Sequence, residues 1–388
     1  MLWLAATAAL LRAVGAGTGD AGSAQAASFE AFWNVGGGWG EQPGAVGGEG
    51  TCPPRDYGLE KFNTSLAALG ILPQNHTNVG ENCCLLGCHA WNDNLPYIDP
   101  AAWKAGMIVP VNGGIPQLVN MTEHLASVRA GVARSIPSAS WSGNAVIDFE
   151  AWRPQWVWDG EHDPPRMNRY HNLSLQLVQQ QHPDWDLRRQ LAKAKEQFDD
   201  AAVDLLTQTL LAARQIRPAA HWGFYGYPGG CVQMAKPSDM DNLRNGAPCQ
   251  ALQDKLRPLW EASTGFFPSI YLPKDAGHGW PNSSSLAAYI QSNIEEALRA
   301  RRLVGKTRQD APVYVYIWPL YLNGSVYLSA EDLENSLQIP YAACADGVVI
   351  WGDRNSANDA AFWRYTREVF APALARVRAM KRQCSTQS

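Results

Sequence analysis

The sequence lacks the features that would mark a membrane-spanning or nucleic-acid-binding protein. After the N-terminal segment it has no stretch of about 18 or more apolar residues, so we expect no transmembrane anchor. Its formal net charge is −4, so no overall basic field attracts nucleic acid, and a polyanionic substrate would need a locally basic groove. Residues 381–388 are polar, which argues against a lipid-anchor signal.

Internal repeats and a second domain are also absent from the sequence. With 388 residues, 46% of them hydrophobic, and 16 tryptophans, the chain can bury a sizeable core in one large barrel. We expect a single domain that acts as a monomer.

The N-terminus and the glycosylation sequons point to the secretory pathway. Residues 1–26 are predicted to be a signal peptide, with a short apolar core at 2–11 and the small-residue cleavage site Ala24-Gln25-Ala26. The even number of cysteines, 8, fits disulfides formed in an oxidising compartment. We therefore expect residues 27–388 to be secreted, either extracellular or lysosomal. The six sequons are at Asn63, Asn75, Asn120, Asn172, Asn282 and Asn323.

Apolar runs alternate with helical stretches along the chain, which is typical of an α/β fold. Such alternation predicts a parallel sheet with right-handed crossovers, and seven or eight such units that close on themselves make a TIM-type barrel. The Gly-rich residues 36–50 are predicted to be a surface insertion. The predicted strands are 31–35, 82–86, 145–149, 221–225, 269–272, 313–318 and 347–351. The predicted helices are 164–181, 186–215, 284–302, 331–337 and 358–381.

Asp148 and Glu150 follow the apolar run 145–147, which predicts a buried strand that ends in two carboxylates. Strand residues two apart share a face, with Cα atoms roughly 6.5–7 Å apart, so we expect these side chains to lie together. Two like charges so close raise one of the two pKa values. Glycoside cleavage needs such a protonated acid beside an ionised partner. A lone D-x-E pair, without informative neighbours, is more often two solvated loop carboxylates.

The neighbours are informative, because V-I-D-F-E-A-W-R-P at 146–154 resembles the catalytic segment of the animal hyaluronidases, glycoside hydrolase family 56. The resemblance continues in order along the chain, from about residue 29 to about residue 378, and implies a distorted TIM-like barrel without a cofactor or metal. Some members carry a cysteine-rich module after the barrel, and we do not expect one here, because only Cys384 follows it. The other matching segments are 112–118 (N-G-G-I-P-Q-L), 182–185 (H-P-D-W), 222–228 (W-G-F-Y-G-Y-P), 268–271 (P-S-I-Y) and 347–352 (G-V-V-I-W-G).

The resemblance implies a retaining, substrate-assisted mechanism on a glycosaminoglycan, hyaluronan or chondroitin. Glu150 would protonate the glycosidic oxygen and then act as the base for water. The substrate's own N-acetyl group would be the nucleophile, with the advantage of an intramolecular reaction. Asp148 would orient the amide nitrogen of that group and stabilise its developing positive charge.

Four further residues are candidates for substrate binding. Tyr225, Tyr271 and Trp351 each fall at the end of a predicted strand, and a TIM-type barrel gathers its active site at the carboxyl ends of its strands. By resemblance, the two tyrosines position and polarise the acetamido group, and Trp351 packs against its methyl. Arg153 would meet a uronic-acid carboxylate or orient the acid, unless it only forms a structural salt bridge.

The cysteines match the family only in part. Cys231 and Cys249 correspond to a family disulfide that closes the loop after the Tyr225 strand. Cys52 resembles the first cysteine of a second family disulfide, but its expected partner near Trp363 is missing. Cys52 must pair elsewhere or stay free. The candidate partners are Cys344, Cys384 and the cluster of Cys83, Cys84 and Cys88.

With His89, the cysteine cluster has the residue types of a zinc site. Its spacing is not C-x2-C, and adjacent cysteines are poor tetrahedral ligands, so we expect disulfides there rather than a metal. The family places an active-site tyrosine in this segment, where Leu86 and Gly87 stand instead. That difference leaves the substrate subsites open.

Two other functions compete with the glycosaminoglycan hydrolase. A chitinase-like hydrolase would share the barrel and the substrate assistance, but its signature has a further Asp where Val146 stands. A glycan-binding or adhesion protein would use a scaffold that has lost catalysis, yet both carboxylates and both tyrosines are present here. The sequence does not decide between hyaluronan and chondroitin, which differ mainly at one hexosamine hydroxyl and in sulfation.

Overall fold

The computed structural model describes most of the chain between residues 29 and 384. The ranges are 29–35, 66–72, 76–79, 95–99, 102–103, 105–157, 164–229, 247–273, 283–322, 324–352, 359–382 and 384. The predicted signal peptide, the Gly-rich insertion, the predicted strand 82–86 and the cysteine cluster with His89 lie outside the described residues. No described helix is long and apolar enough to cross a membrane.

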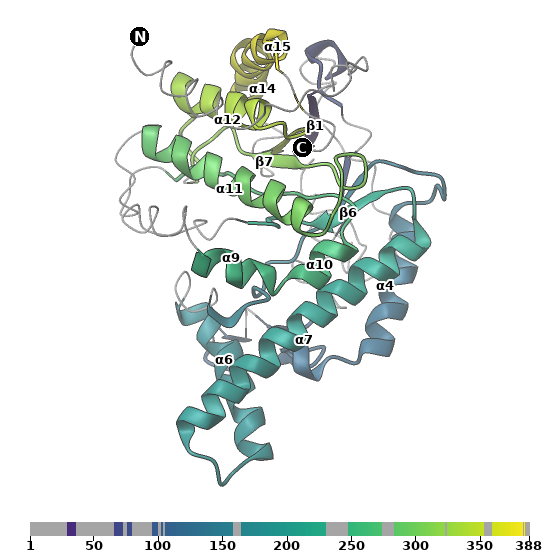
Figure 1. The fold of residues 1–388 in the computed structure, drawn as a ribbon, viewed down its shortest axis with the longest axis vertical. Helices are drawn as coiled ribbons and strands as arrows, with labels where there is room; N and C mark the ends of the chain where they lie inside the picture. The colour runs from purple at the N-terminus through teal and green to yellow at the C-terminus, as the bar shows by residue number, and fades with distance from the viewer. Residues whose placement is uncertain are drawn as a thin grey trace, which may run out of the picture.

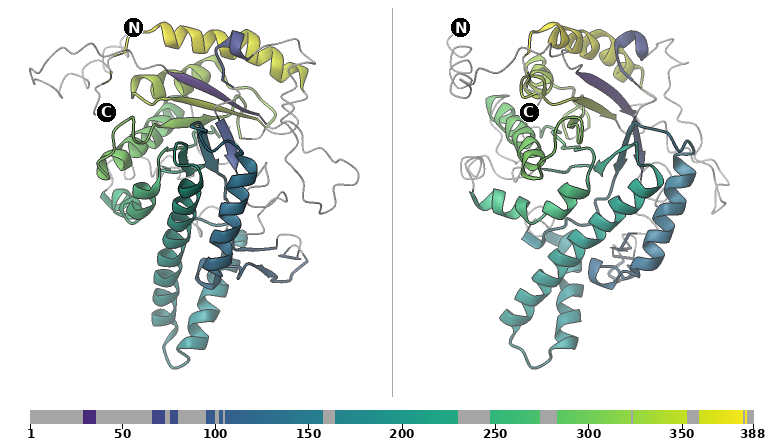
Figure 2. Two further views of the ribbon diagram at one scale, coloured as in Figure 1. Left: turned by 90° about the vertical axis from the view of Figure 1, so that its right-hand side faces the viewer. Right: turned by 45° about the vertical axis from the view of Figure 1, so that its right-hand side comes forward.

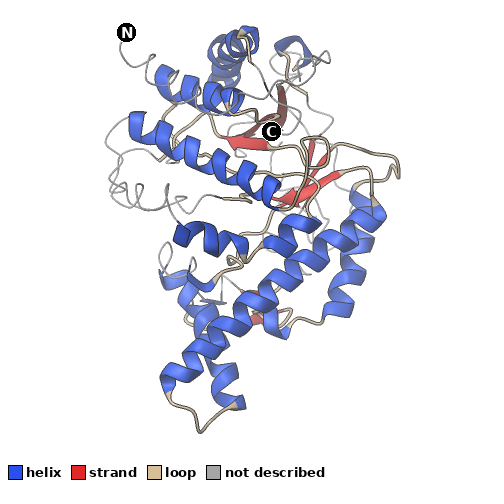
Figure 3. Cartoon of the chain, in the orientation of Figure 1, coloured by secondary structure: helices blue, strands red, loops and turns tan. Residues whose placement is uncertain are grey.

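Two three-stranded parallel sheets form the centre of the fold, surrounded by helices (Figure 3). In one sheet, β8 (Gly347–Gly352) lies between β1 (Glu30–Val35) and β7 (Tyr314–Ile317). In the other, β5 (Asn144–Ile147) lies between β2 (His76–Val79) and β6 (His221–Phe224). A short antiparallel pair, β3 (Tyr97–Ile98) and β4 (Pro110–Val111), lies apart from both sheets.

Single-residue bridges join the two sheets into a barrel. Phe267 bridges Tyr225 just after β6, and Ser269 bridges Tyr316 of β7, so the segment 266–269 stands between these two strands. On the other side, Leu72 bridges Phe32 of β1, a few residues before β2 begins. All of these bridges are parallel, so the carboxyl ends of the strands face the same end of the barrel. The predicted α/β, TIM-like barrel is confirmed.

The helices cover the barrel from outside (Figures 1 and 2). α6 and α7 together project well beyond the strands, and α4 runs alongside α7. The helices are α4 (Met121–Ser135), α6 (Pro164–Gln181), α7 (Leu187–Ile216), α9 (Ala247–Asp254), α10 (Arg257–Ala262), α11 (Ser283–Leu303), α12 (Ala330–Ala342), α14 (Ala360–Tyr365) and α15 (Ala371–Ala379). The 3₁₀ turns are η1 (Ala67–Leu69) and η2 (Pro116–Leu118), and the π-helical turn η4 (Thr366–Phe370) joins α14 to α15.

The long helix α7 shows how local sequence sets an element. Asp186 caps its N-terminus by accepting a hydrogen bond from the backbone N–H of Arg189 at 2.9 Å, and the helix stops before Pro218, which cannot continue it. Apolar residues at helical spacing are buried along α7 from Ala194 onward, among them Phe198, Ala202, Leu206 and Leu210. Leu187 and Leu191, which share this spacing, are 56% and 41% exposed, because the first turns of α7 lie in the projecting part.

Several predicted strand limits are wrong. β5 ends at Ile147 rather than at residue 149, and the predicted strand 269–272 contributes only the bridge at Ser269. β2 was not predicted, since its sequence His-Thr-Asn-Val contains only one strongly apolar residue. Single bridges and short polar strands form because they pair with strands that are distant in the sequence. A local apolar pattern therefore cannot predict them.

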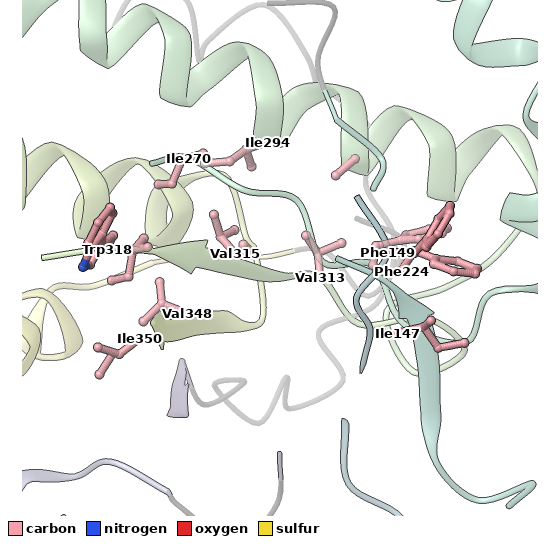
Figure 4. Close-up of a cluster of buried hydrophobic side chains, with 14 of the residues drawn as sticks. Ile147, Phe149, Phe224, Ile270, Ile294, Val313, Val315, Trp318, Val348 and Ile350 are labelled. Atoms are coloured by element: carbon pink, nitrogen blue, oxygen red, sulfur yellow. The ribbon is translucent and has the colours of Figure 1, made fainter. Parts of the chain in front are cut away.

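Alternate strand residues divide between two apolar clusters. Val146, Tyr316 and Val349 belong to a small cluster inside the barrel, together with Phe32, Phe267 and Tyr314. Their neighbours Ile147, Val315, Val348 and Ile350 belong to a larger cluster that includes helix residues such as Ile294 of α11 (Figure 4). The larger cluster therefore packs the barrel against its helices, and it extends to Trp318 just after β7.

Candidate active site

The predicted site residues come from neighbouring elements around the carboxyl end of the barrel. Asp148 and Glu150 follow β5, Tyr225 follows β6, Tyr271 follows the segment 266–269, and Trp351 lies near the end of β8. The rings of Tyr225 and Tyr271 have centroids 6.0 Å apart, and those of Tyr271 and Trp351 are 5.5 Å apart. The charges of both carboxylates act on Tyr225. The structure thus brings all five predicted residues together.

The two carboxylates stand in different surroundings. Asp148 is buried, with only 6% of its surface exposed, whereas the side chain of Glu150 is 35% exposed. Glu150 is therefore accessible to solvent, whereas Asp148 is enclosed by protein. Carboxylates in unlike environments can hold different protonation states, which is the arrangement that acid catalysis requires.

Tyr225 and Tyr271 are held as neutral hydrogen-bonding groups. Burial raises the pKa of Tyr225 well above its usual value, and the negative charges of Glu150 and Asp148 raise it further. Burial likewise raises the pKa of Tyr271, to which Tyr225 and Asp148 contribute. The hydroxyl of Tyr225 donates to Ser269 Oγ at 3.2 Å. Both phenols keep their protons and can interact with an uncharged carbonyl.

Arg153 lies beside the exposed carboxylate. Its guanidinium is 3.8 Å from Glu150 Oε1, and it also lies over the ring of Tyr227, 5.8 Å from the centroid. Burial acts to lower the pKa of Arg153, but Tyr227 and the charge of Glu150 outweigh it, so the pKa is raised. Arg153 is therefore a permanent positive charge at the mouth of the site.

The segment that carries Glu150 is anchored to neighbouring elements by its tryptophans. The indole N–H of Trp152 donates to the carbonyl of Pro96 at 2.8 Å. The backbone N–H of Trp156 donates to Asp199 of α7 at 2.6 Å, and its ring stacks on His171 of α6 with centroids 3.7 Å apart. Each anchor removes freedom from the chain next to the carboxylates.

Three polar or aromatic residues at the same end of the barrel were not predicted from the sequence. Trp318 follows β7 and contacts Trp351, Ser269 accepts the hydrogen bond of Tyr225, and Asn34 of β1 is buried opposite Trp351 in the strand register. Period-two alternation could have found Trp318, which stands two residues after the inward-facing Tyr316.

The described cysteines correct one expectation. Cys344 and Cys384 form a disulfide with Cα atoms 5.7 Å apart, so neither is the partner of Cys52. The correction follows from the path of the chain, which returns after α15 to the start of β8. Cys249 is also disulfide-bonded, but its predicted partner Cys231 lies outside the described residues, as does Cys52.

Other candidate sites among the described residues are few. No group of three or more His, Cys, Asp or Glu residues that could hold a metal occurs within the described ranges. A hollow of about 320 Å³ lies at the start of α4, lined by Asn112, Gly113, Leu118, Val119, Asn120, Glu123, His124 and Ser127. None of the predicted site residues lines it.

The fold and the site together define a class of protein. A closed parallel barrel that presents a carboxylate pair with buried tyrosines at its carboxyl end has the architecture of a glycoside hydrolase. A sequence model of the hyaluronidases, glycoside hydrolase family 56, matches residues 93–388, more than half of the chain. The chain belongs to this family, as its motifs predicted.

Individual relatives agree with this assignment. The hyaluronidase of Apis mellifera is 33% identical over 299 residues, which are 73% of this chain and 72% of that protein. Hyaluronidase-1 of Homo sapiens is 35% identical over 260 residues, 66% of this chain and 55% of that protein. The chain therefore spans little more than half the length of the human relative.

The fold is also similar to a solved structure. A crystal structure of bee venom hyaluronidase in complex with a hyaluronic acid tetramer matches with a TM-score of 0.71 and 27% sequence identity. The match covers 90% of this chain and 99% of that chain.

Proposed function

We propose that this protein is an endo-β-N-acetylhexosaminidase that hydrolyses hyaluronan, chondroitin or both with retention of configuration. The observation that carries the proposal is the meeting of Asp148 and Glu150 with Tyr225 and Tyr271 at the carboxyl end of the barrel. Membership of the hyaluronidase family supports this activity, and the hyaluronic acid tetramer in the bee venom enzyme makes hyaluronan the first substrate to test.

Glu150 is the general acid and base in this proposal. It donates its proton to the glycosidic oxygen as the bond to the anomeric carbon breaks, and later removes a proton from the water that attacks that carbon. Its partial exposure lets it reach a bound glycan. Arg153, 3.8 Å away, stabilises the carboxylate that is left after the proton has been donated.

The nucleophile is the carbonyl oxygen of the substrate's own N-acetyl group. Its attack on the anomeric carbon forms a cyclic oxazolinium ion, which water opens to give the hydrolysed sugar. The amide nitrogen becomes positive in this step, and the buried carboxylate of Asp148 orients and stabilises it. A carboxylate shielded from water acts more strongly on such a charge than an exposed one.

The aromatic residues hold the acetamido group in place for this attack. The neutral hydroxyls of Tyr225 and Tyr271 position and polarise its carbonyl, and the ring of Trp351 packs against its methyl. We further propose that the chain acts as a monomer and is secreted or lysosomal, where both glycosaminoglycans occur.

A reducing-end assay on hyaluronan, chondroitin and chitin oligomers tests the proposal. We expect new reducing ends from hyaluronan or chondroitin, with larger oligosaccharides as early products because the cleavage is internal. Release from chitin alone would assign a chitinase-like activity instead. Binding of a glycan without any cleavage would indicate an adhesion protein and overturn the proposed function.

A further inference from the structure

Trp318 is a buried aromatic residue at the carboxyl end of β7 to which the mechanism above gives no role. Its ring centroid lies 4.7 Å from that of Trp351 with an angle of 85° between the planes, and 6.0 Å from that of Tyr271. Trp318 and Trp351 therefore form a right-angled corner beside Tyr271. Figure 4 shows Trp318 where β7 ends.

The indole N–H of Trp318 is buried and has no hydrogen-bond partner within the part of the chain that the structure describes. A buried donor without an acceptor carries a free-energy cost that a ligand oxygen would remove. Trp33 provides a comparison, because its N–H is also buried without a partner among the described residues. Trp33, however, packs against Phe362 and Trp363 of α14, with ring centroids 6.1 and 4.8 Å apart, rather than against the predicted site residues.

Residues 319–322 and 324–328 lie beside the ring of Trp318. Leu320 bridges Tyr327, and the backbone N–H of Leu322 donates to the carbonyl of Leu272 at 2.9 Å, next to Tyr271. Gly324 has a φ of +69° and lies against Trp318. A Cβ atom at this position would come within 3.2 Å of Trp318 Cη2. Leu322 and Gly324 therefore connect the surroundings of Trp318 to the segment that carries Tyr271.

We propose that Trp318 contacts the substrate, with its ring as a second wall beside Trp351 of the subsite that holds the hexosamine. Its N–H donates to an oxygen of that sugar. An indole suits this place because its rings cover the apolar face of a pyranose while its N–H supplies a polar contact. The inference deepens the proposed function and rests on it for the identity of the sugar.

The test compares Trp318→Phe with the matched control Trp33→Phe. Both substitutions keep an aromatic ring and remove a buried, unpartnered N–H. We expect Trp318→Phe to lower kcat/KM on hyaluronan about tenfold or more, and Trp33→Phe to change it less than about twofold. The midpoint of chemical unfolding, measured for both variants, reports whether either loss reflects stability.

A kcat/KM for folded Trp318→Phe within about twofold of the wild-type value overturns the inference. If Trp318→Phe does not fold, Trp318→Leu replaces it, because leucine also lacks the N–H donor, and an unchanged kcat/KM in this folded variant has the same meaning. If the wild-type protein cleaves no glycan, the proposed function fails by itself. Calorimetry with a hyaluronan hexasaccharide then decides, because equal affinity of wild type and variant, or no binding to either, rejects the role of Trp318.

Discussion

At the residue scale, the two carboxylates of the candidate site differ in their surroundings. Asp148 and Glu150 are two positions apart in the sequence, yet one is buried and the other is partly exposed beside Arg153. In the proposed mechanism, the buried Asp148 acts on a substrate charge, and the partly exposed Glu150 reaches the glycosidic oxygen and water.

Glu150→Gln is expected to abolish turnover while leaving the fold and substrate binding largely intact. The amide has nearly the same shape as the carboxylic acid but cannot donate the proton, and general acid–base catalysis contributes roughly 10²–10⁴-fold. The measurement is kcat on hyaluronan together with the affinity for a hyaluronan oligosaccharide. More than about a tenth of the wild-type rate would show that Glu150 is not the acid.

Asp148→Asn is expected to lose most activity and to change its pH dependence. Without the neighbouring negative charge, Glu150 binds its proton less tightly, and the acid form needed for catalysis disappears at a lower pH. The basic limb of the kcat/KM profile should therefore move toward acid. Asp200→Asn, an exposed carboxylate of α7, serves as the control and should leave the limb in place. A basic limb that does not move in Asp148→Asn would mean that the two carboxylates are not coupled.

At the scale of elements, α6 and α7 support the segment that carries Glu150. Trp156 binds to both helices, through Asp199 of α7 and His171 of α6, and Trp152 packs edge-on against Phe198 of α7 with centroids 5.6 Å apart. These helices project from the barrel, but their middle turns contact the chain that follows Glu150. Their packing should therefore affect catalysis as well as stability.

His171 should make the fold sensitive to acid. Burial lowers its pKa to about 4, against about 6.5 in the unfolded chain. As pH falls from about 6.5 to about 4, only the unfolded state takes up this proton, so the free energy of unfolding falls by at most about 3 kcal/mol. His171→Phe keeps a ring against Trp156 but cannot titrate. In denaturant unfolding at several pH values, the free energy of unfolding should fall less steeply with falling pH for this variant than for the wild type. An identical fall would contradict the assignment.

At the scale of the whole molecule, the candidate site lies at one end of the barrel and a group of buried stabilising contacts lies at the other. The site occupies the carboxyl ends of the strands, whereas Asp346, just before β8, accepts a hydrogen bond from the backbone N–H of Val313 at 2.8 Å and pairs with Arg308. Arg301 lies 3.6 Å from the same carboxylate. These buried contacts join the amino ends of β7 and β8, so substitutions there should act on stability.

The disulfide between Cys344 and Cys384 should stabilise the whole chain. It joins residues 40 apart, and the chain-entropy model gives a loop of that size about 4 kcal/mol. The double variant Cys344→Ala/Cys384→Ala is expected to unfold at lower denaturant concentration, by up to that free energy, with little change in KM. Non-reducing peptide mapping should link these two cysteines, and should also link Cys231 with Cys249. A fragment joining Cys52 to Cys344 or Cys384 would contradict the structure.

The sequence by itself determined the family and the fold class, and it predicted the residues at the centre of the candidate site. The carboxylate pair, the tyrosines and Trp351 could be named because each stands in a long local motif or at the end of an apolar run. The helices of the second half were predictable for a similar reason, since the apolar period of α7 and its Asp186 cap are local signals.

Only the tertiary structure decided how these parts meet. The segment 266–269 completes the barrel through single bridges, Trp318 reaches the site through its contacts with Trp351 and Tyr271, and Cys344 pairs with Cys384. Asp148 and Glu150 acquire different exposure although their sequence surroundings are alike. The bridges, the contacts of Trp318, the disulfide and the unequal exposures share one physical reason. Each feature depends on contacts between residues far apart in the chain, which arise only when the barrel closes and its helices pack around it.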